Sequence, residues 1–371
     1  MDIALNVSIM SMVNGFITKD DILLRFNLTL CAAVILLSLS AQTSYSADRT
    51  LTILNWSEYL DPDLVLRFEQ KYRVKVSEVF YGSDEQRSDL LLQNNADGYD
   101  LILSSGVDLQ SYIKRGWITK LENDRLLFLD LLNPKWRSAF PGAVEYAIPY
   151  FWGTVGIVYR HDVIKEPITH WKQLYSPAPE LKGKIGMIDE PRDLIGMGLK
   201  SLGYSANSEV SMELYEVEKV LQSQKTMVNS YIYMTLDEHS PIVTGEILAS
   251  MIYNGDALMV KEHSENLTFV LPEEGGAIWV DYFTIGAKAK EPELAYAFLN
   301  FINQAEHAAQ LAQFVYYATP NLAAEKLLPA DFLTDKVIYP DASNLKNSEF
   351  YRPLSAKSQR KRNIISINIV P

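Results

Sequence analysis

The stretch that decides the fold is residues 51–62, which read LTILNWSEYLDP. The first six residues are β-rich and predict a strand that ends at Trp56. Asp61 followed by Pro62 is typical of a helix N-cap with proline at the first helical position, and we expect this helix to reach about Tyr72. A strand followed closely by a helix is the repeating unit of open α/β sheets.

The same alternation continues along the chain. Residues 74–81 predict a second strand, and residues 99–103 predict a third. Between them, Ser83 with Gln86 forms a capping-box pattern that opens a helix to about Asn95. This spacing of strands and helices favours a parallel, doubly wound sheet.

The rest of the chain contains two long apolar stretches, 147–159 and 278–287, that are suited to strands crossing between lobes. We expect further strands at 184–188, 246–253 and 267–271, and helices near 192–202, 209–223, 255–263, 291–303 and 305–315. About 324 residues follow residue 47, which is more than one core usually holds, so two lobes are expected. The expected lobes are 48–152 with about 284–320 returning to it, and 153–283 with about 321–371 returning to it.

The N-terminal region predicts a signal peptide covering residues 1–47. Residues 26–39 are an apolar run of signal-peptide length, basic residues precede it, and small residues follow, so we expect cleavage near Ser46 or Ala47 and export to the periplasm. An uncleaved anchor and a later start codon are the alternatives. The single cysteine, Cys31, lies inside this run, so the mature protein is expected to have no disulfide and no cysteine metal ligand.

The composition describes an ordinary globular protein with an acidic surface. The chain is 48% hydrophobic and 22% charged, and its formal net charge is −12 at pH 7. Negative charge disfavours nucleic acid and attracts cations. The five histidines are scattered, and we find no zinc-protease, nucleophile-elbow or phosphate-loop motif. We therefore expect no enzyme activity, no metal and no cofactor.

Aromatic and acidic residues gather where predicted strands end. Trp56 and Tyr59 flank the first strand end, and Trp279 lies two residues before Asp281 on an otherwise apolar strand. Ligand clefts of open α/β sheets form at strand ends. Rings that face ammonium groups, together with carboxylates that neutralise them, suit a flexible organic cation.

Six motifs spread over nearly all of the mature chain resemble one family. They are Asn55-Trp56-Ser57-Glu58-Tyr59, Ile148-Pro149-Tyr150-Phe151-Trp152-Gly153, Leu202-Gly203-Tyr204-Ser205, Pro272-Glu273-Glu274-Gly275-Gly276, Trp279-Val280-Asp281 and Thr319-Pro320-Asn321-Leu322-Ala323-Ala324. Together they resemble the spermidine/putrescine-binding family of periplasmic solute-binding proteins, which capture substrate for polyamine ABC importers. The resemblance implies a two-lobe periplasmic binding protein fold, in which each lobe is a mainly parallel sheet flanked by helices and crossing strands join the lobes.

The resemblance also implies a set of ligand-binding residues. They are Trp56, Ser57, Tyr59, Ser105, Glu190, Asp193, Tyr253, Trp279, Asp281 and Tyr351. Five positions depart from the spermidine binders: Val107 stands where those carry tyrosine, Tyr253 replaces a tryptophan, the acids Glu190 and Asp193 are exchanged in length, and Tyr351 falls where a glutamine occurs. The preferred polyamine is therefore left open.

The function implied is capture of a linear polyamine in an interlobe cleft by a monomer that then docks on an inner-membrane ABC permease. Docking on a membrane signalling receptor is the alternative, and an exported amine-acting enzyme is the third hypothesis.

Structural interpretations are also open for individual residues. Trp56 and Tyr59 are equally suited to a core aromatic pair, and Asp281 to an ion pair with an arginine. Glu190 and Asp193 are both placed to cap a helix that starts near residue 192. A basic cluster at Lys357, Arg360, Lys361 and Arg362, followed by the apolar residues 364–371, is expected to be a solvated chain end, with docking of a partner as the alternative.

Overall fold

The computed structural model describes residues 49–370. The predicted signal peptide, its cleavage site and Cys31 lie outside these residues. No helix between residues 49 and 370 is long and apolar enough to cross a membrane.

The described residues form ten strands that join in one sheet. In chain order the strands are β1 (Thr50–Trp56), β2 (Lys75–Tyr81), β3 (Leu101–Ser105), β4 (Ala147–Arg160), β5 (Ile185–Met187), β6 (Val228–Tyr231), β7 (Ala249–Tyr253), β8 (Leu267–Val270), β9 (Ala277–Ile285) and β10 (Glu349–Phe350). Their order is β2-β1-β3-β9-β4-β7-β5-β6, while β8 pairs with β4 and β10 with β9. The outer strands β1, β2 and β3 are parallel to one another, as are β5, β6 and β7.

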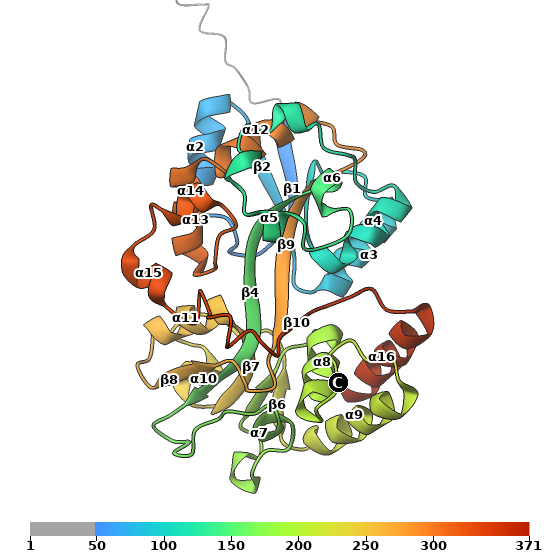
Figure 1. Ribbon diagram of the computed structural model, residues 1–371, viewed down its shortest axis with the longest axis vertical. Helices are drawn as coiled ribbons and strands as arrows, with labels where there is room; N and C mark the ends of the chain where they lie inside the picture. The colour runs from blue at the N-terminus through green and yellow to red at the C-terminus, as the bar shows by residue number, and fades with distance from the viewer. Residues whose placement is uncertain (1–48, 371) are drawn as a thin grey trace, which may run out of the picture. The chain divides into compact units, whose positions relative to one another are not determined.

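Strands β4 and β9 connect the two groups of parallel strands. The N-terminal half of β4 pairs antiparallel with β9, and its C-terminal half pairs with β7 and β8. The ladder with β9 shifts register between Pro149 and Phe151, where proline has no N–H to donate. Figure 1 shows β4 and β9 side by side, running from the region of β1 and β2 to that of β6 and β7. The crossing strands are thus found where the sequence predicted them, whereas the lobe boundaries stay a prediction.

Helices cover the strands, and most of the longer ones lie where the sequence predicts them. They are α2 (Pro62–Tyr72), α3 (Asp84–Asn94), α4 (Leu109–Arg115), α5 (Pro134–Arg137), α6 (Ala143–Tyr146), α7 (Lys172–Tyr175), α8 (Pro191–Ser201), α9 (Ser211–Gln224), α10 (Pro241–Thr244), α11 (Asn254–Glu262), α12 (Pro292–Ile302), α13 (Ala305–Val315), α14 (Leu322–Glu325), α15 (Ala330–Thr334) and α16 (Ala356–Ile369). Short 3₁₀ turns include η1 (Gly106–Asp108).

The predicted helix caps are present. The Asp61 carboxylate accepts a hydrogen bond of 2.8 Å from the Asp63 N–H at the start of α2. Ser83 Oγ accepts one of 3.1 Å from the Gln86 N–H at the start of α3. The Gln86 side chain accepts a hydrogen bond from the N–H of Gly82, one residue before the cap position. These local signals fix where α2 and α3 begin.

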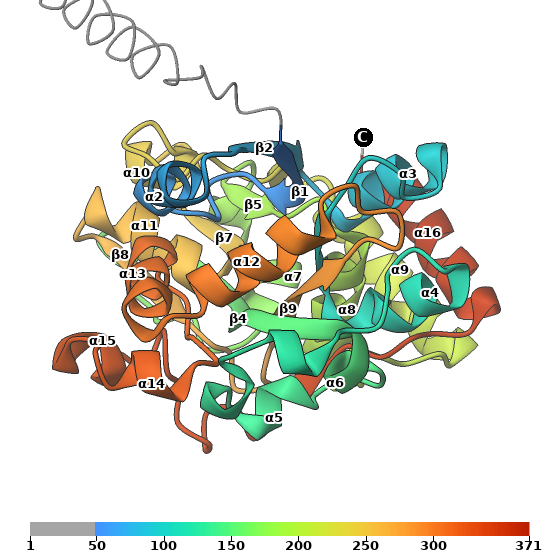
Figure 2. The ribbon, with the colours of Figure 1, turned by 90° about the horizontal axis from the view of Figure 1, so that it is seen from above.

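The structure corrects the expectation for the C-terminal tail. Instead of a solvated end, residues 356–369 form α16, which packs against α8 and α9. The three helices lie together in Figures 1 and 2. Arg362 is buried and donates hydrogen bonds of 2.9 and 2.8 Å to the carbonyls of Ala206 and Ser208, and Ile365 and Ile369 are fully buried. The guanidinium of Arg362, which the sequence suggested would be solvated, is therefore hydrogen-bonded to backbone carbonyls far away in the chain.

Candidate functional site

A cavity of about 480 Å³ lies where β1, β3 and β7 end, beside β9 and the start of α8. All ten residues named from the resemblance line it. Trp56 and Ser105 are the last residues of β1 and β3, Tyr253 is the last residue of β7, and Ser105 pairs directly with Asp281 in the sheet. Strands β1 and β3 are parallel and end at the same edge, whereas β7 runs antiparallel to them across β9 and β4 and ends facing them, so residues far apart in sequence converge.

Asp281 is a buried carboxylate that lines the cavity beside the ends of β1 and β3. Its side chain accepts a hydrogen bond of 3.1 Å from the Tyr59 hydroxyl. The alternative of an ion pair with an arginine is wrong, because no such pair is formed by Asp281 among residues 49–370. Burial, with the nearby charge of Asp84, raises the pKa of Asp281 to about 7. A cation bound beside Asp281 would therefore favour its ionised form and lower its pKa.

Asp193 and Glu190 lie at the start of α8. The Asp193 carboxylate accepts hydrogen bonds from the hydroxyls of Tyr253 (2.8 Å) and Tyr351 (2.6 Å), and burial raises its pKa despite these bonds. Glu190 is the N-cap residue of α8, with a hydrogen bond of 3.4 Å from the Arg192 N–H. Burial, and then the charge of neighbouring Asp84, raises the pKa of Glu190 well above its usual range. The capping interpretation is thus confirmed for Glu190 and wrong for Asp193.

A further carboxylate, Asp256, was missed by the sequence reasoning. It lies in the first turn of α11, three residues after Tyr253, and accepts hydrogen bonds from the hydroxyls of Tyr317 (2.6 Å) and Tyr233. Burial raises its pKa to about 6. The available signal was an acid in the first helical turn after a strand whose last residue, Tyr253, was already assigned to the site.

Aromatic rings form the walls between these carboxylates. The ring of Trp279 is nearly perpendicular to those of Tyr253 and Tyr317, at centroid distances of 6.1 and 4.8 Å. Gly153 of β4 makes room for the indole, because a Cβ there would lie 2.5 Å from Trp279 Cζ2. Gly255 does the same for Tyr317, where a Cβ would lie 2.5 Å from the ring. Tyr59 is buried among aromatic rings, yet its hydroxyl faces Asp281, so it serves both the core and the cavity.

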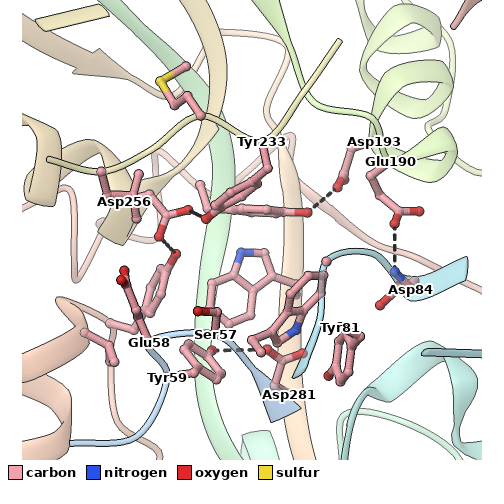
Figure 3. A pocket seen from close by; sticks show the side chains of 18 of the residues that line it. Ser57, Glu58, Tyr59, Tyr81, Asp84, Glu190, Asp193, Tyr233, Asp256 and Asp281 are labelled. Carbon is pink, nitrogen blue, oxygen red and sulfur yellow. Dashed lines mark hydrogen bonds between the residues drawn. The ribbon is translucent and has the colours of Figure 1, made fainter. Parts of the chain in front are cut away.

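The cavity is strongly acidic. Seven carboxylates line it, and Arg192 is the one basic residue among the described residues that do so. The carboxylates belong to Glu58, Asp84, Glu190, Asp193, Asp237, Asp256 and Asp281. Figure 3 shows Asp256 toward one side, Asp193 and Glu190 toward the other, and Asp281 between them. Between residues 49 and 370, no group of three histidine, cysteine or acidic side chains is placed to hold a metal ion. Separated carboxylates between rings suit organic cations with more than one charge.

The fold is shared with solved binding proteins. The substrate-binding protein PotD of a spermidine/putrescine ABC transporter from Streptococcus pneumoniae superposes with a TM-score of 0.73 at 29% identity, covering 87% of this chain and 98% of that chain. The TpPotD lipoprotein of Treponema pallidum superposes with a TM-score of 0.75 at 21% identity, covering 86% of this chain and 99% of that chain. The protein therefore has the two-lobe periplasmic binding protein fold.

The family follows from the sequence comparison. The profile described as bacterial extracellular solute-binding protein matches residues 63–340. The spermidine/putrescine-binding periplasmic protein of Escherichia coli is 33% identical over 331 residues, which are 89% of this chain and 94% of that protein. The chain belongs to the bacterial extracellular solute-binding proteins, and its resemblance to the spermidine/putrescine-binding family is confirmed.

Proposed function

We propose that the protein captures a linear polyamine, such as spermidine or putrescine, in the cavity described above. The observation that carries the proposal is the placement of Asp193, Asp256 and Asp281 at separate points of one aromatic-walled cavity. A buried ammonium loses several kcal/mol of hydration unless anionic acceptors replace its water, and these carboxylates supply such acceptors. The names of the relatives, spermidine/putrescine-binding periplasmic proteins, support the same ligand class.

The magnitudes are sufficient for tight binding without any covalent step. Each methylene buried against the rings contributes about 0.8 kcal/mol, and each desolvated cation over a ring adds roughly 0.5–2 kcal/mol. A sub-micromolar Kd needs a little more than about 8 kcal/mol. The ligand-binding roles of the ten named residues, and of Asp256, belong to this proposal.

The proposed setting is the periplasm, and the proposed partner is an inner-membrane ABC permease that receives the polyamine from a monomeric binding protein. Docking on a membrane signalling receptor uses the same cavity and stays a prediction. A polyamine-uptake assay in a deletion strain distinguishes the two, because only the permease role predicts slower uptake.

The direct test is a ligand panel measured by thermal shift and calorimetry. We expect putrescine, cadaverine, norspermidine, spermidine or spermine to raise the melting temperature, since a ligand at 100 times its Kd stabilises the folded state by about 2.7 kcal/mol. Uncharged diols of matching length are the control, because they lack the charge that the carboxylates would neutralise. No shift with any polyamine at millimolar concentration would contradict the proposal. Recovery of intact polyamine after long incubation argues against the enzyme hypothesis.

Polyamine affinity is expected to depend on pH. The pKa values of about 7 for Asp281 and about 6 for Asp256 mean that both groups hold protons in mild acid, whereas a bound ammonium favours their ionised forms. Alkylammonium groups titrate near 10, so the ligand stays charged. We expect Kd to fall at least roughly tenfold from pH 5 to pH 8, with proton release on binding near pH 6.5. Calorimetry in two buffers of different ionisation enthalpy measures both, and a Kd that is flat over this range contradicts the expectation.

The stability of the unliganded protein should change in the opposite direction. An unfolded aspartate ionises near pH 4, but folded Asp281 ionises near 7, so between these values the folded state holds the extra proton. The unfolding free energy contributed by this group is therefore present below about pH 4 and is lost as the pH rises through about 7. Opposite pH trends for binding and for unliganded stability separate a site effect from a general effect of pH.

A further inference from the structure

Arg192 is the one basic side chain among the described residues that line the acidic cavity. A guanidinium beside a proposed ammonium site repels the ligand, so its presence needs another reason. Its hydrogen-bonding partners belong to the group of elements that contains β1, β2 and β3, whereas Arg192 belongs to the group that contains β5, β6 and β7; these two groups are called the two walls of the cavity. Arg192 is in the first turn of α8, which follows β5, whereas its partners Asp84 and Asp108 lie in α3 and η1, on either side of β3 along the chain.

The contacts are short and use both arms of the guanidinium. Arg192 Nη1 lies 2.6 Å from Asp84 Oδ2, and Nη2 lies 3.2 Å from Asp108 Oδ1. The Asp84 N–H also donates a hydrogen bond of 3.3 Å to Glu190, two residues before Arg192. Arg192 is thus held by two acids that belong to the opposite wall. Figure 3 shows this Glu190 to Asp84 contact bridging α8 and α3.

A second arginine holds these two acids in place. Arg87 of α3 is fully buried, and its Nη1 and Nη2 lie 2.6 Å from Asp84 Oδ1 and from Asp108 Oδ2. Each carboxylate therefore gives one oxygen to Arg87 and leaves the other for Arg192. The result is a ring of alternating charges in which three members lie on one wall and the fourth, Arg192, comes from the other.

We propose that Arg192 is a positioning residue that latches the two walls of the cavity together through Asp84 and Asp108, and does not itself bind the ligand. The ion pairs of the latch involve only side chains of the protein. They therefore form without ligand, and a fraction of the unliganded protein has the two walls in contact. A second consequence rests on the proposed function. The latch slows the release of polyamine, because opening the cavity requires Arg192 to leave both carboxylates. The effect falls on the dissociation rate, as most differences in affinity between related complexes do.

Asp108 provides a way to test the latch without changing the cavity, because it is not among the residues that line the cavity. Arg192→Gln removes the charge from α8, and Asp108→Asn weakens the acceptor on the opposite wall while Asp84 stays. If the two residues act through each other, the effects of the single variants on the dissociation rate are not additive in the double variant. Arg125→Gln is the matched control, because Arg125 pairs with Glu293 away from the cavity.

The experiment measures the distance between the walls by double electron–electron resonance in the full chain carrying Cys31→Ser. Spin labels are placed by Leu92→Cys on α3 and Met212→Cys on α9, both at exposed positions. We expect a short-distance population in the unliganded parent, a clear decrease of it in Arg192→Gln and Asp108→Asn, and no decrease in Arg125→Gln. Stopped-flow release of spermidine should be roughly 10- to 100-fold faster in the two latch variants.

Two results would overturn the latch: an unliganded parent with only long distances, or latch variants whose distances match those of the parent. The proposed function fails by a different result, which is the lack of any spermidine effect on the parent. The distance comparison without ligand does not depend on that outcome, so the two failures are distinguishable.

Discussion

Asp281→Asn is expected to weaken spermidine binding by roughly 30-fold to a few thousand-fold, which corresponds to about 2–5 kcal/mol. The variant keeps the shape of the side chain and an oxygen that can accept from the Tyr59 hydroxyl, but it removes the charge that would face an ammonium. Isothermal titration calorimetry at pH 8, where the parent carboxylate is ionised, measures the difference.

Stability provides the check that the loss is local. Burial raises the pKa of Asp281 to about 7, so at pH 8 the unliganded parent carries a buried charge that is costly, and the neutral amide removes this cost. We therefore expect no decrease in the melting temperature of unliganded Asp281→Asn. Asp341→Asn, at an exposed ion pair with Lys336, is the matched control and should bind as the parent does. An Asp281→Asn protein with parental affinity would remove the central carboxylate from the proposed site.

Local signals in the sequence were enough for much of the fold. The caps at Asp61 and Ser83 fix the starts of α2 and α3, and the apolar stretches around residues 150 and 280 predict the crossing strands β4 and β9. Strand β6, residues 228–231, was not predicted, because VNSY shows neither a long apolar run nor clear alternation. The predicted strand at 246–253 begins only at Ala249.

The candidate site was predictable to the extent that strand ends and family motifs mark it. The geometry of open sheets brings Trp56 and Ser105 to one edge, the end of β7 places Tyr253 opposite them, and the motifs add the rest of the ten residues. The ion pairs around Arg192 and the helix around Arg362 were not predictable in this way. Their partners lie about 85 to 155 positions away in the chain, and no local pattern marks an arginine whose charge will be satisfied by distant oxygens.

Arg87 illustrates the same point with a large expected effect on stability. Its side chain is fully buried, forms ion pairs of 2.6 Å with Asp84 and Asp108, and donates a hydrogen bond of 2.8 Å to the Tyr112 hydroxyl. Removing one partner of a buried ion pair leaves uncompensated charge and typically costs about 3–5 kcal/mol. We expect Arg87→Met to lower the unfolding free energy by this amount.

Urea unfolding at pH 7 measures the effect, with two variants for comparison. Arg125→Gln, at an exposed pair with Glu293, should cost at most about 1 kcal/mol, because water screens that pair. Arg87→Lys keeps the charge but loses the fork that reaches both carboxylates, so its cost should lie between the other two. A loss of less than about 1 kcal/mol in Arg87→Met would mean that Asp84 and Asp108 take up protons or water easily. Asp84 and Asp108 would then bind Arg192 only weakly, and this result would argue against the latch.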